Sequence, residues 1–290
     1  MRIFAVGATG VLGGALVPEL LGRGHRVTVM APDRLDGVPD RAEAVAGDLL
    51  DAGTDLAPLV EGHDAVVNVA TSMPRDPSRP GAWALAGRVR SEGTPRLVDA
   101  VRRASVGRMV QMSITMAYAP GGDRWLREDA PFDPDPARRA LVGPVAEMED
   151  AVTAVPPGEL AWTVLRGARF VGPGTVQDAQ RDLLSRGALS VPGEEGSYVS
   201  MVHVADFADA VVAAVERGLV GRVLNVADIP VRVGDYYRAL AERTGTPAPP
   251  TDPGTAPDLP SHRVWSGAAG TELGWAPRRG VLPEPVPAHG

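Results

Sequence analysis

The chain has 290 residues, of which 44% are hydrophobic and 4% aromatic, and its formal net charge is −7. This length predicts about two domains with a sizeable core, and the acidic balance argues against nucleic acid binding. The sequence has no Cys and all 29 basic residues are Arg, which excludes disulfides, thiolate metal sites, Cys nucleophiles and chemistry that needs a Lys ammonium. We expect a cytoplasmic protein without membrane partners, because neither a run of 18 apolar residues nor a signal peptide is recognisable.

The first half of the chain alternates short apolar strands with helices. Strands are predicted at 3–6, 26–30, 65–70 and 108–113, and helices at 11–22 and 94–103. Buried strands that alternate with helices indicate a parallel sheet with right-handed crossovers. The predicted fold class is therefore α/β, with a doubly wound parallel sheet.

The pattern becomes looser after about residue 131. Predicted here are helices at 144–155, 205–217 and 234–244, strands at 162–166 and 222–226, a Pro-rich loop at 247–260 and a frayed end at 283–290. We place a first domain at 1–165, with further sheet elements from about 200–228, and a second region at 166–290.

A glycine-rich turn joins the first predicted strand to the first predicted helix. It reads Gly7-Ala8-Thr9-Gly10-Val11-Leu12-Gly13. Three glycines permit a tight turn, a close approach of the backbone to a pyrophosphate, and close packing of a helix whose N-terminus attracts phosphate. The turn therefore predicts a dinucleotide site. The alternative is a tight turn in a fold whose cofactor site has decayed.

Seven motifs follow one another in a characteristic order. They are the glycine-rich turn, Gly-Asp-Leu-Leu-Asp at 47–51, Val-Asn-Val-Ala at 67–70, Leu-Arg-Gly at 165–167 with Val-Gly-Pro-Gly at 171–174, Val-His-Val-Ala-Asp at 202–206, Asn-Val-Ala-Asp at 225–228 and Leu-Gly-Trp-Ala-Pro at 273–277. Together they resemble the extended short-chain dehydrogenase/reductase family, also called the NAD-dependent epimerase/dehydratase family. The resemblance implies a Rossmann-like first domain, a smaller C-terminal substrate-binding domain, and a site between them.

The resemblance also implies cofactor contacts. It places Asp48 and Leu49 beside the adenine and Ala70 near the nicotinamide ribose, although Asp48 is alternatively a turn or cap residue. NAD-preferring relatives carry an acid at the end of the second strand, where this chain has Ala31. Arg34 follows shortly and can hold the 2′-phosphate of NADP by a bidentate contact, so we favour NADP over NAD. The alternative for Arg34 is a solvated loop residue.

Four positions depart from the polar pattern of the family. Its members use Ser or Thr together with Tyr-x-x-x-Lys, in which Tyr is the acid/base and Lys lowers the pKa of Tyr and binds the nicotinamide ribose. Here Ile114 stands at the Ser position, Val142 at the Tyr position and Ala146 at the Lys position, and Arg90 replaces an Asn. Residues 118–128 also resemble a subgroup of unassigned chemistry, through Tyr-x-x-x-Gly-x-x-Trp-x-x-Glu. The resemblance is thus to an atypical subgroup that lacks the Ser-Tyr-Lys set.

Four side chains remain as candidates for catalysis: Ser113, Thr115, Tyr118 and His203. The first three follow the fifth strand, at the edge where open α/β sheets bind ligands. Tyr118 can replace the missing acid, although a pKa of about 10 suits neutral pH poorly, and the alternative is a Tyr packed under the substrate loop. His203 has an ordinary pKa of about 6.5, which suits acid/base work, but its motif alternatively positions the following helix.

The substrate is expected to contact residues after the fourth and sixth strands. Arg166 and Arg169 can bind an anionic or carbonyl-bearing substrate, or alternatively pair with a nearby acid. The remaining pocket wall is predicted to consist of Thr71, Ser72, Met73, Trp83 and Tyr198. The spaced acids of the loop at 129–135 are interpreted as solvated residues, so no metal site is predicted.

These features lead to three hypotheses. The first is an NAD(P)-dependent oxidoreductase with a non-standard active site, which acts on a small molecule of specialised metabolism. The second is a non-redox cyclase, isomerase or lyase on the same scaffold, with a structural or absent cofactor and catalysis by positioning. The third is a non-catalytic NAD(P)-sensing protein. A homodimer is one expectation, since relatives often pair through helices of the Rossmann domain.

Overall fold

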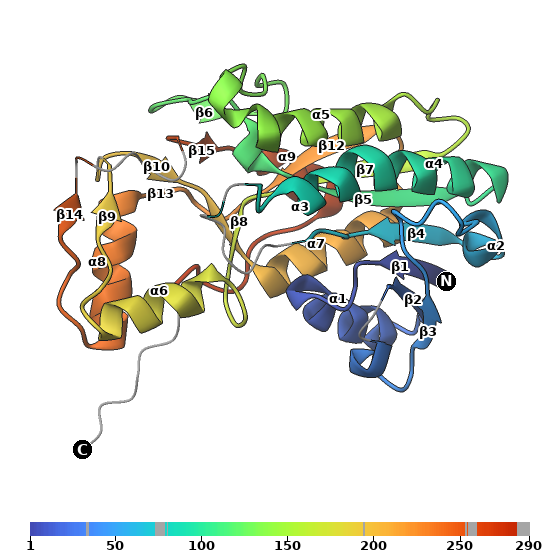
Figure 1. Ribbon diagram of the computed structural model, residues 1–290, viewed down its shortest axis with the longest axis horizontal. Coiled ribbons are helices and arrows are strands. Elements are labelled where there is room, and N and C mark those ends of the chain that lie inside the picture. Colours follow the sequence, from blue (N-terminus) through green and yellow to red (C-terminus); the bar gives the residue numbers. More distant parts are fainter. Residues whose placement is uncertain are drawn as a thin grey trace.

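The computed structural model describes residues 1–32, 35–72, 79, 81–193, 195–252, 254 and 260–282. Its centre is a parallel sheet with helices on both faces (Figure 1). From one edge to the other, the seven strands are β12 (Arg222–Val226), β7 (Ala161–Gly167), β5 (Arg108–Ile114), β4 (Ala65–Asn68), β1 (Arg2–Val6), β2 (Arg26–Ala31) and β3 (Glu43–Ala46). The predicted Rossmann-like, doubly wound α/β fold is confirmed.

The strand order reverses beside β1. The chain first proceeds from β1 to β2 and β3, and then returns to the other side of β1 for β4, β5, β7 and β12. Open parallel sheets bind ligands outside the carboxyl ends of their strands at such a switch point. The ends of β1 and β4 therefore mark the expected ligand edge.

Each face of the sheet has its own core. In β1, Ile3 and Ala5 pack toward α1 (Val11–Gly22) and α7 (Val204–Arg217). Phe4 and Val6 point to the opposite face, where α4 (Thr94–Arg103) and α5 (Arg139–Thr153) lie. Because both faces are covered, most residues of the inner strands are apolar on both sides and do not alternate with polar residues, although buried polar residues such as Asn68 and Gln111 occur. Three short helices complete the layers: α2 (Ala57–Val60), α3 (Ala84–Arg88) and α9 (Gly267–Leu273).

A smaller region lies beyond the carboxyl ends of the sheet strands, at the left of Figure 1. It contains α6 (Val176–Ser185) and α8 (Val233–Thr244), which pack around Leu184, Tyr236 and Leu240. Its short strand pairs are β8 (Arg169–Val171) with β11 (Met201–His203), β9 (Val191–Pro192) with β14 (Thr251–Asp252), and β10 (Tyr198–Val199) with β13 (Val231–Arg232). A further pair, β6 (Trp125–Leu126) with β15 (Arg263–Val264), joins two distant loops. The division at residue 165 remains a prediction.

The predicted helix at 144–155 is corrected at its start. The structure begins α5 at Arg139, so that Pro144 lies inside the helix. Proline favours the first helical turn, which is why the sequence suggested a start there. In the structure its ring lies against α3, 3.3 Å from the position that a Cβ on Gly87 would take. Helix packing thus tolerates a proline beyond the first turn.

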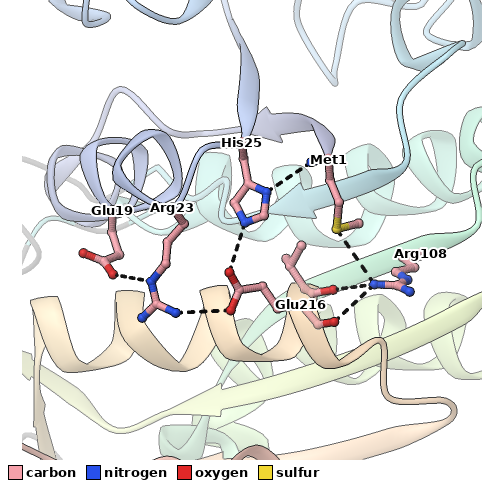
Figure 2. Close-up of polar contacts among 7 residues, drawn as sticks. Met1, Glu19, Arg23, His25, Arg108 and Glu216 are labelled. Carbon is pink, nitrogen blue, oxygen red and sulfur yellow. Dashed lines mark hydrogen bonds and ion pairs between the residues drawn. The ribbon is translucent and has the colours of Figure 1, made fainter.

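A cluster of polar contacts ties the opposite, amino-terminal edge of the sheet to α7 (Figure 2). Glu216 accepts hydrogen bonds from Arg23 Nη1 and lies 3.2 Å from His25 Nε2. The other ring nitrogen of His25 lies 3.3 Å from the amino group of Met1. Arg108 Nη1 donates to the carbonyl of Glu216. These contacts fix the last turn of α7 against β1, β2 and β5, far from the ligand edge.

His262 joins the C-terminal segment to the sheet and is 4% exposed. Its Nε2 lies 2.9 Å from the carbonyl oxygen of Tyr118, to which a neutral ring donates. Its own carbonyl accepts a hydrogen bond from Ser200. Burial lowers the pKa of His262 from 6.5 to about 4.

Within the described ranges, no helix is long and apolar enough to cross a membrane.

The first prediction concerns His262→Gln. Between pH 6.5 and 4 the unfolded His262 binds a proton that the folded one does not, so the wild-type free energy of unfolding falls as pH falls through this range. From pH 7 to pH 5 this group accounts for a loss of about 2 kcal/mol. Urea unfolding at both pH values should show a smaller loss in the variant by this amount. Equal losses in the two proteins would contradict the assignment.

Candidate cofactor and substrate site

The glycine-rich turn has the geometry of a phosphate cradle. Gly7 has a φ of +79°, and a Cβ on it would lie 2.3 Å from Ala70 Cα, so the turn passes directly against the end of β4. A Cβ on Gly13 would lie 1.9 Å from the carbonyl oxygen of Ala8. Gly10 caps α1 without any side-chain hydrogen bond, and a Cβ there would meet only the Gly7 oxygen, at 3.7 Å.

This cradle fits a dinucleotide. The first N–H groups of α1 have no side-chain acceptor, and the positive end of the helix dipole faces the open glycine surface. Ala8 and Leu12 are buried in the core, Thr9 is half-buried and Val11 is 47% exposed. The residues of the turn thus fit the pyrophosphate of a dinucleotide, which they would hold by backbone N–H groups; a nicotinamide dinucleotide would supply hydride chemistry there.

Of the predicted adenine and ribose residues, Ala70 lies directly against this cradle. Asp48 is half-buried and accepts a hydrogen bond from the backbone N–H of Leu50 at 2.8 Å, which is the turn geometry of the alternative interpretation. Leu49 is buried against α4, 2.9 Å from the Cβ position of Gly93. The backbone N–H of Ala70 donates to Asn68. Arg34 and Met73 lie outside the described residues, so the choice between NADP and NAD remains a prediction.

A buried ion pair lies where β5 and β7 end. Arg166 Nη2 is 2.7 Å from Glu149 Oε2, and Arg166 Nε donates to both carboxylate oxygens. The same Glu149 accepts a 2.5 Å hydrogen bond from the Ser113 hydroxyl. Both charged side chains are nearly enclosed, at 10% and 7% exposure. Arg166 is therefore engaged by an acid, which is the alternative that the sequence left open.

Tyr118 belongs to the same network. Its ring is fully buried, its hydroxyl donates to Asn225 Oδ1 at 2.8 Å and accepts from Arg166 Nη1 at 2.7 Å. Burial raises the pKa of Tyr118 to about 12, although the charge of Arg166 opposes this rise. Glu128 accepts from the backbone N–H of Asn225. This geometry does not favour Tyr118 as a proton donor; the Tyr-to-Glu pattern of 118–128 instead brings two residues to one buried network.

The sequence did not identify Glu149 and Asn225 as members of this network. Asn225 is the first residue of one of the family motifs, so the sequence could have indicated that it is a site residue. Glu149 lies three residues after Ala146 and thus on the same side of α5 as the position that the family gives to Lys. This spacing indicates that Glu149 faces inward, whereas its pairing with Arg166 depends on how α5 packs on β7.

His203 caps α7. Its Nδ1 accepts a hydrogen bond from the backbone N–H of Ala205 at 3.2 Å, as in the alternative interpretation of its motif. Its Nε2 lies 2.5 Å from the Cβ position of Gly172, so the ring packs on the turn after β8. Burial lowers the pKa of His203, which keeps the ring neutral. The motif's Asp206 is fully buried and holds the backbone and guanidinium of Arg279.

A pocket lies between the sheet edge and the smaller region. It brings together three predicted residues, Thr115, Arg169 and Tyr198, with Met116, Val171, Met201 and Tyr236. Among the residues that the structure describes, the Arg169 guanidinium has no hydrogen bond and no ion pair. Thr71, Ser72 and Trp83 lie outside the described lining of this pocket. The described lining of the pocket therefore combines an apolar wall with the available cation of Arg169.

The cradle predicts opposite effects for two neighbouring glycines. Gly13→Ala places a methyl group against the Ala8 carbonyl and should lower the affinity for NAD(P)H at least about tenfold in calorimetry. Gly14→Ala is the matched control, because no atom lies within 4 Å of its Cβ position. It should bind normally and gain about 0.5–1 kcal/mol in helix stability. Equal affinity of both variants would contradict the cradle.

The buried ion pair predicts a large stability loss in Glu149→Gln. Removing one partner leaves the Arg166 charge uncompensated, which costs about 3–5 kcal/mol in urea unfolding. The exposed pair between Arg186 and Asp182 provides the control. Asp182→Asn should change stability by about 0.5 kcal/mol or less. A loss of this small size in Glu149→Gln would contradict the role of the pair.

Comparisons with known proteins agree with this geometry. Residues 7–218 match the family model described as NAD(P)H-binding. The chain is 36% identical over 297 residues, with 96% of both chains covered, to the 3-diazoavenalumate denitrifying reductase of a Streptomyces species. It is 28% identical to sterol demethylase protein B of Methylococcus capsulatus, over 86% of this chain and 76% of that protein.

Solved structures share the fold. MoeE5 in complex with UDP-glucuronic acid and NAD has a TM-score of 0.80 at 23% identity, over 97% of this chain and 95% of that chain. DesIV, the dTDP-glucose 4,6-dehydratase of Streptomyces venezuelae, has a TM-score of 0.81 at 21% identity, over 97% and 93%. The chain has the extended short-chain dehydrogenase/reductase fold and belongs to the NAD(P)H-binding family.

Proposed function

We propose that the protein is an NAD(P)H-dependent reductase that replaces the diazo group of a small carboxylate substrate by hydrogen. The relative at 36% identity supports this class, because its name specifies a diazo compound, loss of nitrogen and reduction, and the ending "-ate" denotes a carboxylate. The two chains match over nearly their whole length. The remaining support comes from what the site lacks.

The observation that carries the proposal concerns proton donors. Reduction of a carbonyl leaves negative charge on oxygen, and a positioned acid normally neutralises it. Tyr118 is enclosed with a pKa of about 12, and His203 is a neutral helix cap. The chain has no Lys, and hydrophobic side chains stand at the Tyr and Lys positions of the family. A reaction that needs no acid from the protein suits this site best.

Reduction of the diazo substrate has this property when the substrate reacts as an arenediazonium cation. The substrate carbon accepts a hydride as its C–N bond breaks, the bonding electrons leave with N2, and the products are R–H, N2 and NAD(P)+. Charge is balanced without a proton, since the diazonium cation and NAD(P)H give a neutral product and NAD(P)+. The leaving group thus replaces the acid.

The chain then has to bind and orient its two ligands. The glycine-rich turn is the proposed pyrophosphate site, and Arg169 is the proposed contact for an anionic group of the substrate in the pocket. Met116, Val171 and Met201 would exclude water from the reacting carbon. Holding the reactants in a near-attack geometry supplies much of the rate increase.

Deuterium transfer tests the proposal. The purified protein is incubated with a carboxylated arenediazonium salt and NADPH or NADH deuterated at C4 of the nicotinamide. We expect equal amounts of oxidised cofactor and N2, and one deuterium at the carbon that carried nitrogen. Gly13→Ala measures the background reaction, because it lacks the cradle. Product without cofactor oxidation would favour a non-redox lyase or isomerase, and no turnover of diazo or carbonyl compounds would overturn the reductase.

A further inference from the structure

One buried cation has no partner in the described part of the chain. Arg90 lies in the π-helical turn Val89–Gly93, between α3 and α4, and is 8% exposed. No hydrogen bond or ion pair joins its guanidinium to a described residue. Burial lowers the pKa of Arg90. Buried charges in proteins are normally paired, so a partner is missing.

The place of Arg90 follows from its own helix. Thr94, one turn later, receives a 3.3 Å hydrogen bond from Asn68, which is the last residue of β4. A helix of this fold runs antiparallel to the strand before it, so Arg90 lies past the carboxyl end of β4. Side chains on a helix also tilt toward its N-terminus, which here is the direction of the ligand edge.

The neighbouring helix gives a second reference point. Gly87, three residues before Arg90, packs against Pro144 of α5, and the turn Val89–Gly93 packs on the same helix. Arg90 therefore lies between α5 and the carboxyl end of β4.

The guanidinium of Arg90 keeps a small exposed surface. Among the described residues, Arg181 Nε is the one fully enclosed side-chain nitrogen or oxygen that lacks a partner. The nitrogens of Arg90 also lack a described partner, and they are not fully enclosed. Of the two other Arg residues near this edge, Arg166 is paired with Glu149 and Arg169 lines the pocket. π-helical turns also occur frequently at functional sites.

We propose that Arg90 binds an oxyanion of a ligand in the cleft, either a carboxylate of the substrate or a phosphate of the cofactor, by a bidentate contact. The proposal rests on the proposed function for the presence of these two ligands. A planar guanidinium with two parallel donors matches either group. In this way the ligand supplies the anion that the described residues do not place beside Arg90.

Two titrations test the proposal in Arg90→Gln. Calorimetry measures NADPH binding to the free protein, and then cinnamate binding to the protein saturated with NADP+, with cinnamamide as the uncharged probe. The variant should lose at least about tenfold affinity in one of the two titrations. A loss for NADPH assigns the oxyanion to the cofactor, and a loss for cinnamate with no change for cinnamamide assigns it to the substrate.

Arg102→Gln is the matched control. Arg102 lies in the last turn of α4, at the end of the helix that points away from the ligand edge, and it is exposed and pairs with Glu159 at 2.6 Å. The variant removes the same charge and should bind both ligands as the wild type does. Unchanged or undetectable binding in both Arg90→Gln titrations, or an equal loss in Arg102→Gln, would overturn the proposal.

Thermal unfolding and the variant Arg90→Lys test whether Arg90 has a purely structural role. An unpaired buried cation does not stabilise the free protein, so Arg90→Gln should unfold no lower than the wild type without ligand. Arg90→Lys keeps the charge but loses the fork, and should bind with intermediate affinity. A strongly destabilised Arg90→Gln would overturn the proposal. If Arg90→Gln loses ligand binding but the wild type does not reduce a diazo substrate, only the proposed function is refuted. If the wild type reduces a diazo substrate but Arg90→Gln binds both ligands normally, only the role of Arg90 is refuted.

Discussion

The buried ion pair between Arg166 and Glu149 determines how the ligand edge is built. Burying two charges is costly unless excellent geometry and further hydrogen bonds compensate for it. Here Ser113, Tyr118 and the carbonyl of Glu128 complete the contacts, so that β5, β7 and α5 and the loop at 118–128 are held together. Through Tyr118 and Asn225 the same network reaches β12. The pocket wall at Thr115 and Met116 directly follows β5 and is positioned by this network.

The network also restricts the chemistry. Three side chains that could donate protons near this edge are used for structure: Tyr118 in the network, His203 at the start of α7 and His262 against the Tyr118 carbonyl. A family scaffold that normally supports carbonyl and sugar chemistry thus presents hydrophobic groups and Arg in place of its acid. A substrate that carries its own leaving group is well matched to such an edge.

The sequence predicted the fold well where local signals are strong. Periodicity placed the helices 11–22 and 94–103 at the same bounds as the structure, because apolar spacing and flanking Gly or Pro define both ends. It missed β3 and α6, since one is an exposed edge strand and the other is amphipathic within a Gly- and Pro-rich stretch. It named Ser113, Tyr118 and Arg166 as neighbours of a site, but not that Glu149 pairs with them. Such a pairing depends on the register between α5 and β7, which neither segment encodes alone.

The path of the C-terminal segment has a consequence for motion. After the smaller region the chain returns to the sheet: β15 pairs with β6, the Trp275 indole donates to the carbonyl of Asp206, and the Asp206 carboxylate holds Arg279. The sheet layer and the smaller region are therefore connected by contacts at several points and not by a single linker. Hinge rotation of one part against the other would break these contacts, so ligand exchange has to proceed through local opening of segments around the pocket. Turnover in such a protein is sensitive to the rigidity of its loops rather than to a swing between two lobes.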